Sequence, residues 1–336
     1  MKAMVFDRYG AAGDVLELRD VEVPDVGEDG VLIRVRAAAI NPADWHLING
    51  VPYIARAQIG LRRPKVSGLG ADLAGQVMEV GPTVTRFRPG DEVYGMVDNL
   101  PGTNILDLGS VAEYVRVSED SVRPLPSTLT PQEAAAVPVA ATTALRGLRD
   151  IAALQPGQHV LVNGASGGVG TFAVQIAKAL GAQVTGVCST RNVQLVRSLG
   201  ADHVVDYTRE DPTRQRQRVD VVLDNVGNRP LRAWRRVLRR DGTYLASFGQ
   251  KEHRVLGPMA YLLRTAVLNL VVPQQMTLLP TERNNQELDT LTELIEAGKV
   301  RPVIDRTYPL AAAPEAMDYL GRGHARGKVV VTVQEG

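Results

Sequence analysis

The chain has 336 residues, a length that favours two domains over one compact core. Its hydrophobic content of 44%, charged content of 22% and formal net charge of +1 are those of an ordinary globular protein, and they exclude a disordered chain, a collagen-like repeat and a coiled coil. The near-neutral charge argues against a dedicated nucleic-acid surface, and one cysteine cannot form an internal disulfide or a thiolate zinc site.

The first residues of the chain bear on secretion and on membrane insertion. MKAMVFDRYG lacks the apolar core of a secretion signal. The most apolar stretch, 259–272, contains Arg264 and is shorter than the roughly 20 residues that cross a bilayer. We therefore expect a cytoplasmic protein with no membrane partner.

Residues 1–124 contain short apolar segments separated by turn residues. Examples are the segments 31–40 and 74–80, and the turn at Pro89-Gly90-Asp91. Frequent turns and alternating patterns predict a β-rich first domain, built as an antiparallel barrel or sandwich.

Residues 125–272 follow a different pattern. Thr130-Pro131-Gln132-Glu133 has the form of a capping box with proline at the first helical position, which predicts a helix start. From residue 156 onward, apolar strands alternate with helical segments, which predicts βαβ units and a doubly wound parallel sheet. Residues 273–336 contain a helical segment at 288–300 and a strand at 327–333, and we expect them to return to the first domain.

The most informative segment is the glycine-rich turn within 160–182. Gly164, Gly167 and Gly170 lie three residues apart between a predicted strand and a predicted helix. In dinucleotide-binding folds such glycines make a tight turn, let the backbone approach the pyrophosphate and let the helix pack on the strand. The phosphates then lie at the helix N-terminus, which favours anions. We predict cofactor contacts from Gly164, Ser166, Gly167, Gly168, Val169 and Gly170.

The same turn also satisfies G-x-S-x-G, the nucleophile elbow of α/β-hydrolases, with Ser166 as nucleophile. Asp224 with His253 or His324 would complete the required order of Ser, Asp and His. No HGGG-type oxyanion segment lies upstream, and Gly170 has no role in an elbow. These two observations favour the dinucleotide interpretation.

The end of the next strand bears on the choice of nicotinamide cofactor. NAD-selective folds place Asp or Glu about 20 residues beyond the glycines. Here Ser189-Thr190-Arg191 follows the strand with no acid, and Arg191 offers a fork suited to a 2′-phosphate. Tyr207, at the end of the following strand, could add a hydroxyl. The alternative is that Ser189-Thr190-Arg191 only caps the next helix. We predict NADPH rather than NADH.

Several segments together resemble the zinc-independent medium-chain dehydrogenases/reductases of the quinone oxidoreductase (zeta-crystallin-like) group, over essentially the full chain. The resemblance implies a GroES-like catalytic domain formed by both chain ends (1–124 and 273–336) and a Rossmann NADP-binding domain (125–272). The matching segments are AAINPADW, GADLAG, RFRPGDEVYG, AAAVPVAATTAL, NGASGGVG, LGADHVVDY and GKVVVTV.

The resemblance also implies site residues. Asn41 and Asp44 match the N-x-x-D segment of the catalytic cleft, and Tyr53 is a candidate proton donor. For Asp44 and Tyr53, loop capping and packing is the competing interpretation. Further cofactor contacts are expected on the nicotinamide side, from Thr143, Val226, Gly227, Ser247, Phe248 and Lys328.

The activity implied by the resemblance is reduction of a quinone or an α,β-unsaturated carbonyl by NADPH. Cys188 is the single cysteine, and the five histidines show no paired metal spacing, so we expect no metal site. Two alternatives stay open: a tailoring reductase for one specialised metabolite, and a non-enzymatic NADPH-binding protein. A homodimer is expected from the family alone.

The segment 229–240 carries six arginines. Nucleic-acid binding is one interpretation of them. The other is a solvated outer helix with Trp234, Val237 and Leu238 facing inward, and we favour it, so we expect no nucleic-acid partner.

Overall fold

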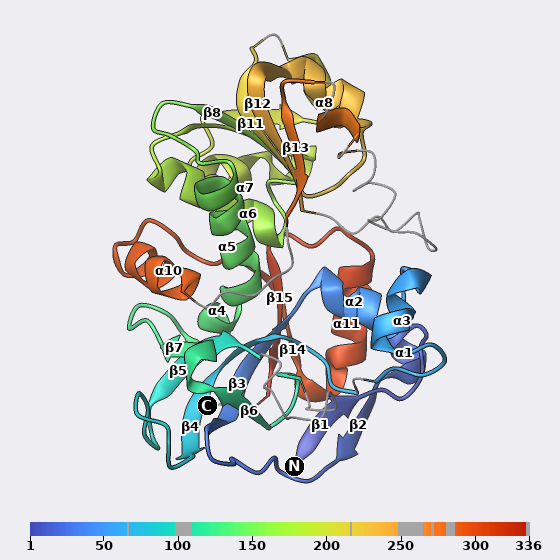
Figure 1. Ribbon diagram of the computed structural model, residues 1–336, viewed down its shortest axis with the longest axis vertical. Helices are drawn as coiled ribbons and strands as arrows, with labels where there is room; N and C mark the ends of the chain where they lie inside the picture. Colours follow the sequence, from blue (N-terminus) through green and yellow to red (C-terminus); the bar gives the residue numbers. More distant parts are fainter. Residues whose placement is uncertain are drawn as a thin grey trace. The chain divides into compact units, whose positions relative to one another are not determined.

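The computed structural model describes residues 1–65, 67–97, 109–215, 217–247, 265, 267–269, 272–279 and 286–333. The chain forms two compact units, and the first is built from three separate segments: Met1–Val139, Arg283–Glu296 and Pro302–Gly336. The second unit consists of Ala140–Glu282 and Ala297–Arg301. Both ends of the chain therefore belong to one unit (Figure 1).

The first unit is β-rich. Its seven-stranded sheet has the path β14-β15-β3-β4-β5-β7, and β6 also pairs with β3. The red strand β15 lies against the blue strand β3, so the end of the chain completes a sheet that its beginning starts (Figure 1). The strands are β1 (Lys2–Val5), β2 (Glu17–Asp20), β3 (Gly30–Ile40), β4 (Asp72–Val80), β5 (Glu92–Met96), β6 (Tyr114–Ser118), β7 (Val122–Pro124), β14 (Ile304–Pro309) and β15 (Lys328–Thr332).

Short helices complete this unit. The predicted capping box is confirmed at the start of α4, because Glu133 accepts the Thr130 N–H at 2.9 Å and Thr130 Oγ1 accepts the Glu133 N–H at 3.3 Å. The α-helices are α1 (Ala12–Val15), α2 (Pro42–Asn49), α3 (Arg56–Ile59), α4 (Pro131–Ala135), α10 (Glu287–Glu296) and α11 (Ala313–Gly321). The 3₁₀ turns are η1 (Tyr53–Ala55), η2 (Glu119–Ser121) and η6 (Leu310–Ala312).

The second unit has a six-stranded parallel sheet in the order β10-β9-β8-β11-β12-β13. This is the doubly wound order of a Rossmann fold, and it reverses between β8 and β11. Every residue of β8 is buried, as expected for a sheet covered on both faces. The strands are β8 (His159–Asn163), β9 (Gln183–Cys188), β10 (His203–Asp206), β11 (Val219–Asp224), β12 (Leu238–Ala246) and β13 (Gln275–Leu278).

The helices of the second unit follow its strands. As predicted, Trp234 and Val237 of α8 are buried, and they belong to the unit's core with Leu238. The α-helices are α6 (Gly168–Ala179), α7 (Val193–Ser198) and α8 (Leu231–Val237), and α5 (Pro138–Leu145) begins in the first unit. The remaining turns are the π-helix η3 (Arg146–Ile151) and the 3₁₀ helices η4 (Thr190–Asn192) and η5 (Pro212–Arg214).

The unit boundaries differ from the predicted ones. The first unit extends to Val139 rather than to residue 124, because α4 packs on β3 and β4 and the Val139 N–H donates to Asp72 at 2.8 Å. The second unit extends past residue 272, because β13 pairs with β12. Across the part of the chain that the structure describes, no helix combines the length and the apolar character needed to cross a membrane.

Candidate dinucleotide-binding and catalytic sites

The glycine turn between β8 and α6 lies at the carboxyl end of β8. Gly164 has φ +77°, in the left-handed region that favours glycine. At Gly170 a Cβ would lie 2.1 Å from the Gly164 carbonyl oxygen, so the helix can approach the strand only without a side chain there. Gly164 and Gly170 are thus required by the fold itself.

Gly167 differs from these two residues. Its φ of −86° suits any residue, and the nearest atom to an added Cβ, at 3.5 Å, is the Gly164 carbonyl oxygen. Neither backbone conformation nor packing within the chain requires a glycine at this position. In a dinucleotide fingerprint, the second glycine allows close approach of the ligand to the backbone.

The N-terminus of α6 is suited to an anion. The N–H groups of Gly168, Val169 and Gly170 lie in its first turn, and they have no acceptor among the described residues. Free N–H groups and the helix dipole at such an end favour a phosphate. The turn therefore fits a dinucleotide pyrophosphate.

Ser166 is buried in this turn, and its Oγ accepts a hydrogen bond from Asn192 Nδ2 at 2.9 Å. It lacks the strained backbone of a nucleophile elbow, since Ala153 is the one non-glycine residue with positive φ in the described ranges. Asp224 has its own donors, described next, and His253 lies outside the described residues. The structure gives no support to the hydrolase alternative.

Asp224 organises the neighbouring strand end, and sequence reasoning considered it only as part of a hydrolase triad. It is fully buried at the end of β11. Its Oδ1 accepts the N–H groups of Val226 and Gly227 at 3.0 and 2.9 Å, and its Oδ2 accepts the Tyr244 hydroxyl at 2.7 Å. The carboxylate thereby holds Val226 beside the turn, since a Cβ on Gly164 would lie 2.8 Å from Val226 Cγ2.

The remaining residues expected to contact the nicotinamide lie on different elements. Thr143 lies in α5, and Ser247 follows β12 and donates its N–H to the Asp224 carbonyl at 2.9 Å. Phe248 lies outside the described residues. Val226, Gly227 and Ser247 share the carboxyl edge of the parallel sheet with the glycine turn, and ligands of such sheets bind at this edge.

The end of β9 brings together the residues expected to contact a 2′-phosphate. Arg191 is exposed, and Tyr207 is 44% exposed with its N–H bonded to the Cys188 carbonyl at 3.1 Å. Ser189 accepts a hydrogen bond from Asn192 Nδ2 at 3.3 Å. The three residues lie at one corner of the sheet, because β9 and β10 are paired along their length.

Thr190 has a partner that sequence reasoning did not identify. Its hydroxyl donates to Asp206 Oδ2 at 2.6 Å, and its contact with a phosphate stays a prediction. This hydrogen bond from Thr190, with further donors on Thr208, holds the pKa of Asp206 below its usual value. Sequence reasoning considered Tyr207 beyond the end of β10 but not Asp206, the acidic residue before it.

A second group of predicted residues is assembled in the first unit. Asn41 follows β3, and Lys328 is the first residue of β15; both are buried. Lys328 Nζ donates to Asn41 Oδ1 at 2.5 Å and to Asp72 Oδ2 at 2.9 Å. Asp72 is fully buried, and sequence reasoning did not select it.

Asp44 and Tyr53 both have contacts within the first unit. Asp44 accepts the Asn41 N–H at 2.7 Å at the start of α2, which is the capping role given as the competing interpretation. Tyr53 is 44% exposed, and the Arg56 guanidinium lies 4.7 Å from its ring centroid. The proton-donor role of Tyr53 stays a prediction.

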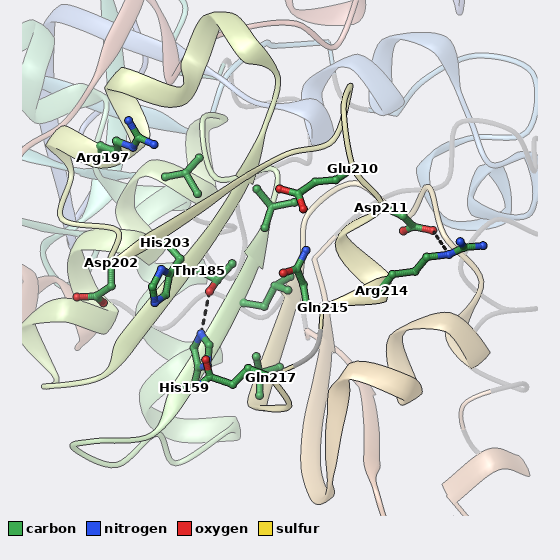
Figure 2. Close-up of a pocket in the computed structure, with 14 residues that line it drawn as sticks. His159, Thr185, Arg197, Asp202, His203, Glu210, Asp211, Arg214, Gln215 and Gln217 are labelled. Atoms are coloured by element: carbon green, nitrogen blue, oxygen red, sulfur yellow. Dashed lines mark hydrogen bonds and ion pairs between the residues drawn. The ribbon is translucent and has the colours of Figure 1, made fainter.

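A pocket of about 750 Å³ lies elsewhere in the second unit (Figure 2). His159, His203 and Val219 begin β8, β10 and β11, so the pocket lies at the amino ends of the parallel strands. The glycine turn lies at their carboxyl ends. This pocket is therefore not the dinucleotide site.

Two family models match the chain: the alcohol dehydrogenase GroES-like domain over residues 27–127 and the zinc-binding dehydrogenase over residues 199–331. The NAD(P)H oxidoreductase RTN4IP1, mitochondrial, of Mus musculus is 37% identical, over 99% of this chain and 89% of that protein. The chain belongs to the medium-chain dehydrogenase/reductase family.

Further relatives place this dehydrogenase/reductase in the quinone oxidoreductase group. The 2-methylene-furan-3-one reductase of Solanum lycopersicum is 36% identical, over 98% of this chain and 79% of that protein. The structure of the quinone oxidoreductase from Coxiella burnetii matches with a TM-score of 0.84 and 31% identity, over 99% of both chains. The family and the fold predicted from the sequence, a GroES-like domain and a Rossmann domain, are confirmed, and the protein is an oxidoreductase.

The predicted cytoplasmic location is wrong. RTN4IP1 of mouse, cattle, zebrafish and human is named as mitochondrial, and relatives in Arabidopsis thaliana and Triphysaria versicolor are named for the chloroplast. These names point to an organelle. The prediction used the lack of a secretion signal and of a stretch long enough to cross a bilayer, and neither observation bears on import into an organelle.

The family model that matches residues 199–331 is named for zinc binding. Among the described residues, no group of three or more His, Cys, Asp or Glu side chains is placed to hold a metal ion. In the first unit, the Lys328 ammonium donates hydrogen bonds to Asn41 and Asp72.

Proposed function

We propose that this dehydrogenase/reductase uses NADPH to reduce a quinone or an α,β-unsaturated carbonyl without a metal ion. The observation that carries the proposal is Gly167, which lacks a side chain although the fold does not require this. With the free N–H groups of α6, it provides a place for the pyrophosphate of a dinucleotide. The bound nicotinamide supplies a hydride, and the protein supplies orientation and stabilisation of charge.

The proposal includes a preference for NADPH over NADH. The cofactor of the mouse relative is named only as NAD(P)H. Support for NADPH comes from Arg191 and from the lack of an acidic residue within Ser189-Thr190-Arg191, the segment that follows β9. The Asp206 carboxylate on the neighbouring strand disfavours a 2′-phosphate, because both groups are negatively charged. The Arg209 guanidinium lies 3.5 Å from that carboxylate and offsets its charge.

The acceptor class follows from the chemistry of the first unit. Reduction of an enone or a quinone places negative charge on an oxygen, and a hydrogen-bond donor near that oxygen stabilises it. Asn41 has such a donor in its side-chain amide. The names of the tomato and Coxiella proteins, an enone reductase and a quinone oxidoreductase, support these acceptors.

The test is a screen of quinones, enones and aldehydes, with NADPH and NADH oxidation followed by absorbance. We expect turnover with quinones or enones and a higher kcat/KM with NADPH. Replacing Arg191 by Ala should weaken NADPH about ten- to a hundredfold and NADH little, since a hydrogen bond to a charged group contributes roughly 1.5–3 kcal/mol.

Two results would contradict the proposal. Equal kcat/KM with both cofactors would refute NADPH selectivity, and absence of turnover with every acceptor would refute the reductase. Binding of NADPH without turnover would identify a cofactor-binding protein that is not a reductase. The homodimer expected from the family is a separate prediction, which sedimentation equilibrium tests.

A further inference from the structure

Three neighbouring strands bring Asn41, Asp72 and Lys328 together inside the first unit. β15 pairs with β3, and β3 pairs with β4, with the register Val329↔Ile40 and Asp72↔Ala39. The side chains of the three residues therefore meet at one end of the sheet. Lys328 is 3% exposed and Asp72 is 0% exposed, so water does not solvate this pair of charges.

The hydrogen bonds of the cluster assign the orientation of the Asn41 amide. Its Oδ1 accepts from Lys328 Nζ at 2.5 Å, and its Nδ2 donates to Asp72 Oδ2 at 3.0 Å. The reverse orientation would direct the NH₂ group at the ammonium and the carbonyl oxygen at the carboxylate. Both contacts would then be repulsive, so the amide is held in one orientation.

This orientation leaves one hydrogen on Asn41 Nδ2 with no acceptor among the described residues. The Oδ1 atom is engaged by the ammonium, and an ammonium cannot accept a hydrogen bond. Asn41 is therefore prepared to donate to a ligand rather than to accept from one. Such a donor suits an acceptor oxygen on which negative charge develops.

A contribution to folding stability does not explain the buried pair of Asp72 and Lys328. A buried ion pair loses the hydration of two charges, and apolar replacements of similar volume are often neutral or stabilising. Asp72 also accepts the Val139 N–H at 2.8 Å through Oδ1, which fixes the carboxylate itself. The Asp72 carboxylate and the Lys328 ammonium together hold the Asn41 amide in place through hydrogen bonds.

We propose that Asp72 and Lys328 are positioning residues that fix Asn41 as a hydrogen-bond donor to the acceptor oxygen. Lys328, expected to be a cofactor contact, acts instead through Asn41. This inference rests on the proposed reductase function. It adds two residues that touch neither the hydride nor the acceptor.

The decisive variant is Asp72→Asn. Its carbonyl oxygen can retain the Val139 N–H, but its NH₂ group then faces two other donors, Lys328 and Asn41, and the Asn41 amide loses its fixed orientation. We expect kcat/KM for the acceptor to fall about tenfold, the equivalent of one hydrogen bond. The dissociation constant for NADPH, measured by calorimetry, should stay within about twofold.

A double-mutant cycle separates positioning from a general structural effect. In an Asn41→Ala background, Asp72→Asn should cause no further loss of kcat/KM, because the residue it positions is absent. Additive losses in the cycle, or a single variant with wild-type kcat/KM, would overturn the proposal. The proposed function fails separately, if the wild-type enzyme turns over no acceptor.

The chain offers a matched control in Asp202→Asn. Asp202 also pairs with a lysine, Lys178, at 2.9 Å, and it also accepts a backbone N–H, from Val184 at 2.7 Å. This pair belongs to the second unit, whereas Asn41 belongs to the first. We expect kcat/KM of Asp202→Asn within about twofold of the wild type, and a tenfold loss there would count against a specific role for Asp72.

A second pair of variants applies if Asp72→Asn does not fold. Lys328→Met removes the ammonium and leaves Asn41 Oδ1 without its donor, whereas Lys328→Arg keeps a charged donor. We expect the Met variant to lose about tenfold in kcat/KM and the Arg variant to lose less. Equal activity of the Met variant and the wild type would contradict the assignment.

Discussion

Cys188 shows how burial controls the chemistry of a single side chain. The thiol is 2% exposed at the end of β9. Burial, with a further contribution from the Asp206 carboxylate, raises its pKa to about 11. Since the thiolate is the reactive form, the native protein should resist thiol reagents even at alkaline pH.

We predict that native protein reacts with a disulfide reagent at about pH 8 at least about a hundredfold more slowly than free cysteine. Denatured protein should release one equivalent of the reagent's chromophore, because the chain has one cysteine. Absorbance measures both reactions. Rapid stoichiometric labelling of the native protein would show that Cys188 is accessible.

His159 gives the stability of the protein a dependence on pH. Its Nε2 is paired with Thr185 Oγ1 at 2.8 Å (Figure 2), whereas its buried Nδ1 has no hydrogen-bond partner among the residues that the structure describes. Burial, followed by the influence of His203, lowers its pKa from the usual value of 6.5. The folded protein therefore keeps this imidazole neutral where the unfolded chain already binds a proton.

Acid weakens the folded state through His159. Stability from His159 is complete above the unfolded pKa and is lost as the pH falls below it. We predict that lowering the pH from about 7.5 to about 5.5 reduces the melting temperature of the wild type more than that of His159→Gln, which cannot be protonated. Calorimetry tests this, with His324→Gln, an exposed site, as the control. Parallel curves for wild type and His159→Gln would contradict it.

At the scale of an element, the turn into α6 shows that similar glycines serve different purposes. Gly170 is needed for packing, and Gly167 is not. The two positions therefore allow stability and cofactor binding to be separated within one helix turn.

We predict that Gly170→Ala destabilises the protein by about 1–3 kcal/mol, because a methyl group would overlap the Gly164 carbonyl. Gly167→Thr should change stability by less than about 0.5 kcal/mol, since threonine and glycine are similar N-caps, but weaken NADPH at least about tenfold. Denaturant unfolding and calorimetry measure the two effects. A Gly167→Thr variant with unchanged NADPH affinity would remove the main support for the pyrophosphate site.

At the scale of the whole molecule, the two units differ in how the chain builds them. The six-stranded sheet is assembled entirely within residues 140–301, and Gln175 bonds the backbone of Arg301 through both ends of its amide, at 2.9 Å each. The first unit needs β14 and β15 from the end of the chain, and β15 pairs with β3.

We therefore predict that a fragment of residues 140–301 folds alone and binds NADPH, whereas residues 1–139 do not fold cooperatively. The fragment of residues 1–139 lacks β15, the strand that pairs with β3, and it leaves the buried Asp72 without Lys328. Thermal denaturation followed by circular dichroism tests both fragments. A cooperative transition of residues 1–139 would show that the returning strands are dispensable.

Much of the architecture could be read from local patterns. The capping box at Thr130, the strand–turn–helix at Gly164 and the alternation of strands and helices depend on residues close together in the chain, so short-range rules apply to them. The glycine turn was identified for the same reason. The sequence by itself thus determined the fold class, the family and the dinucleotide turn.

The tertiary structure alone decided which polar groups become partners. Asp72 and Lys328 are separated by 256 positions, and their contact depends on the order of strands in the sheet. Thr190 was expected to face a phosphate but donates to Asp206, 16 positions away on a neighbouring strand end. Local sequence contains no information on such pairings, because a strand's neighbours are set by the packing of the whole sheet.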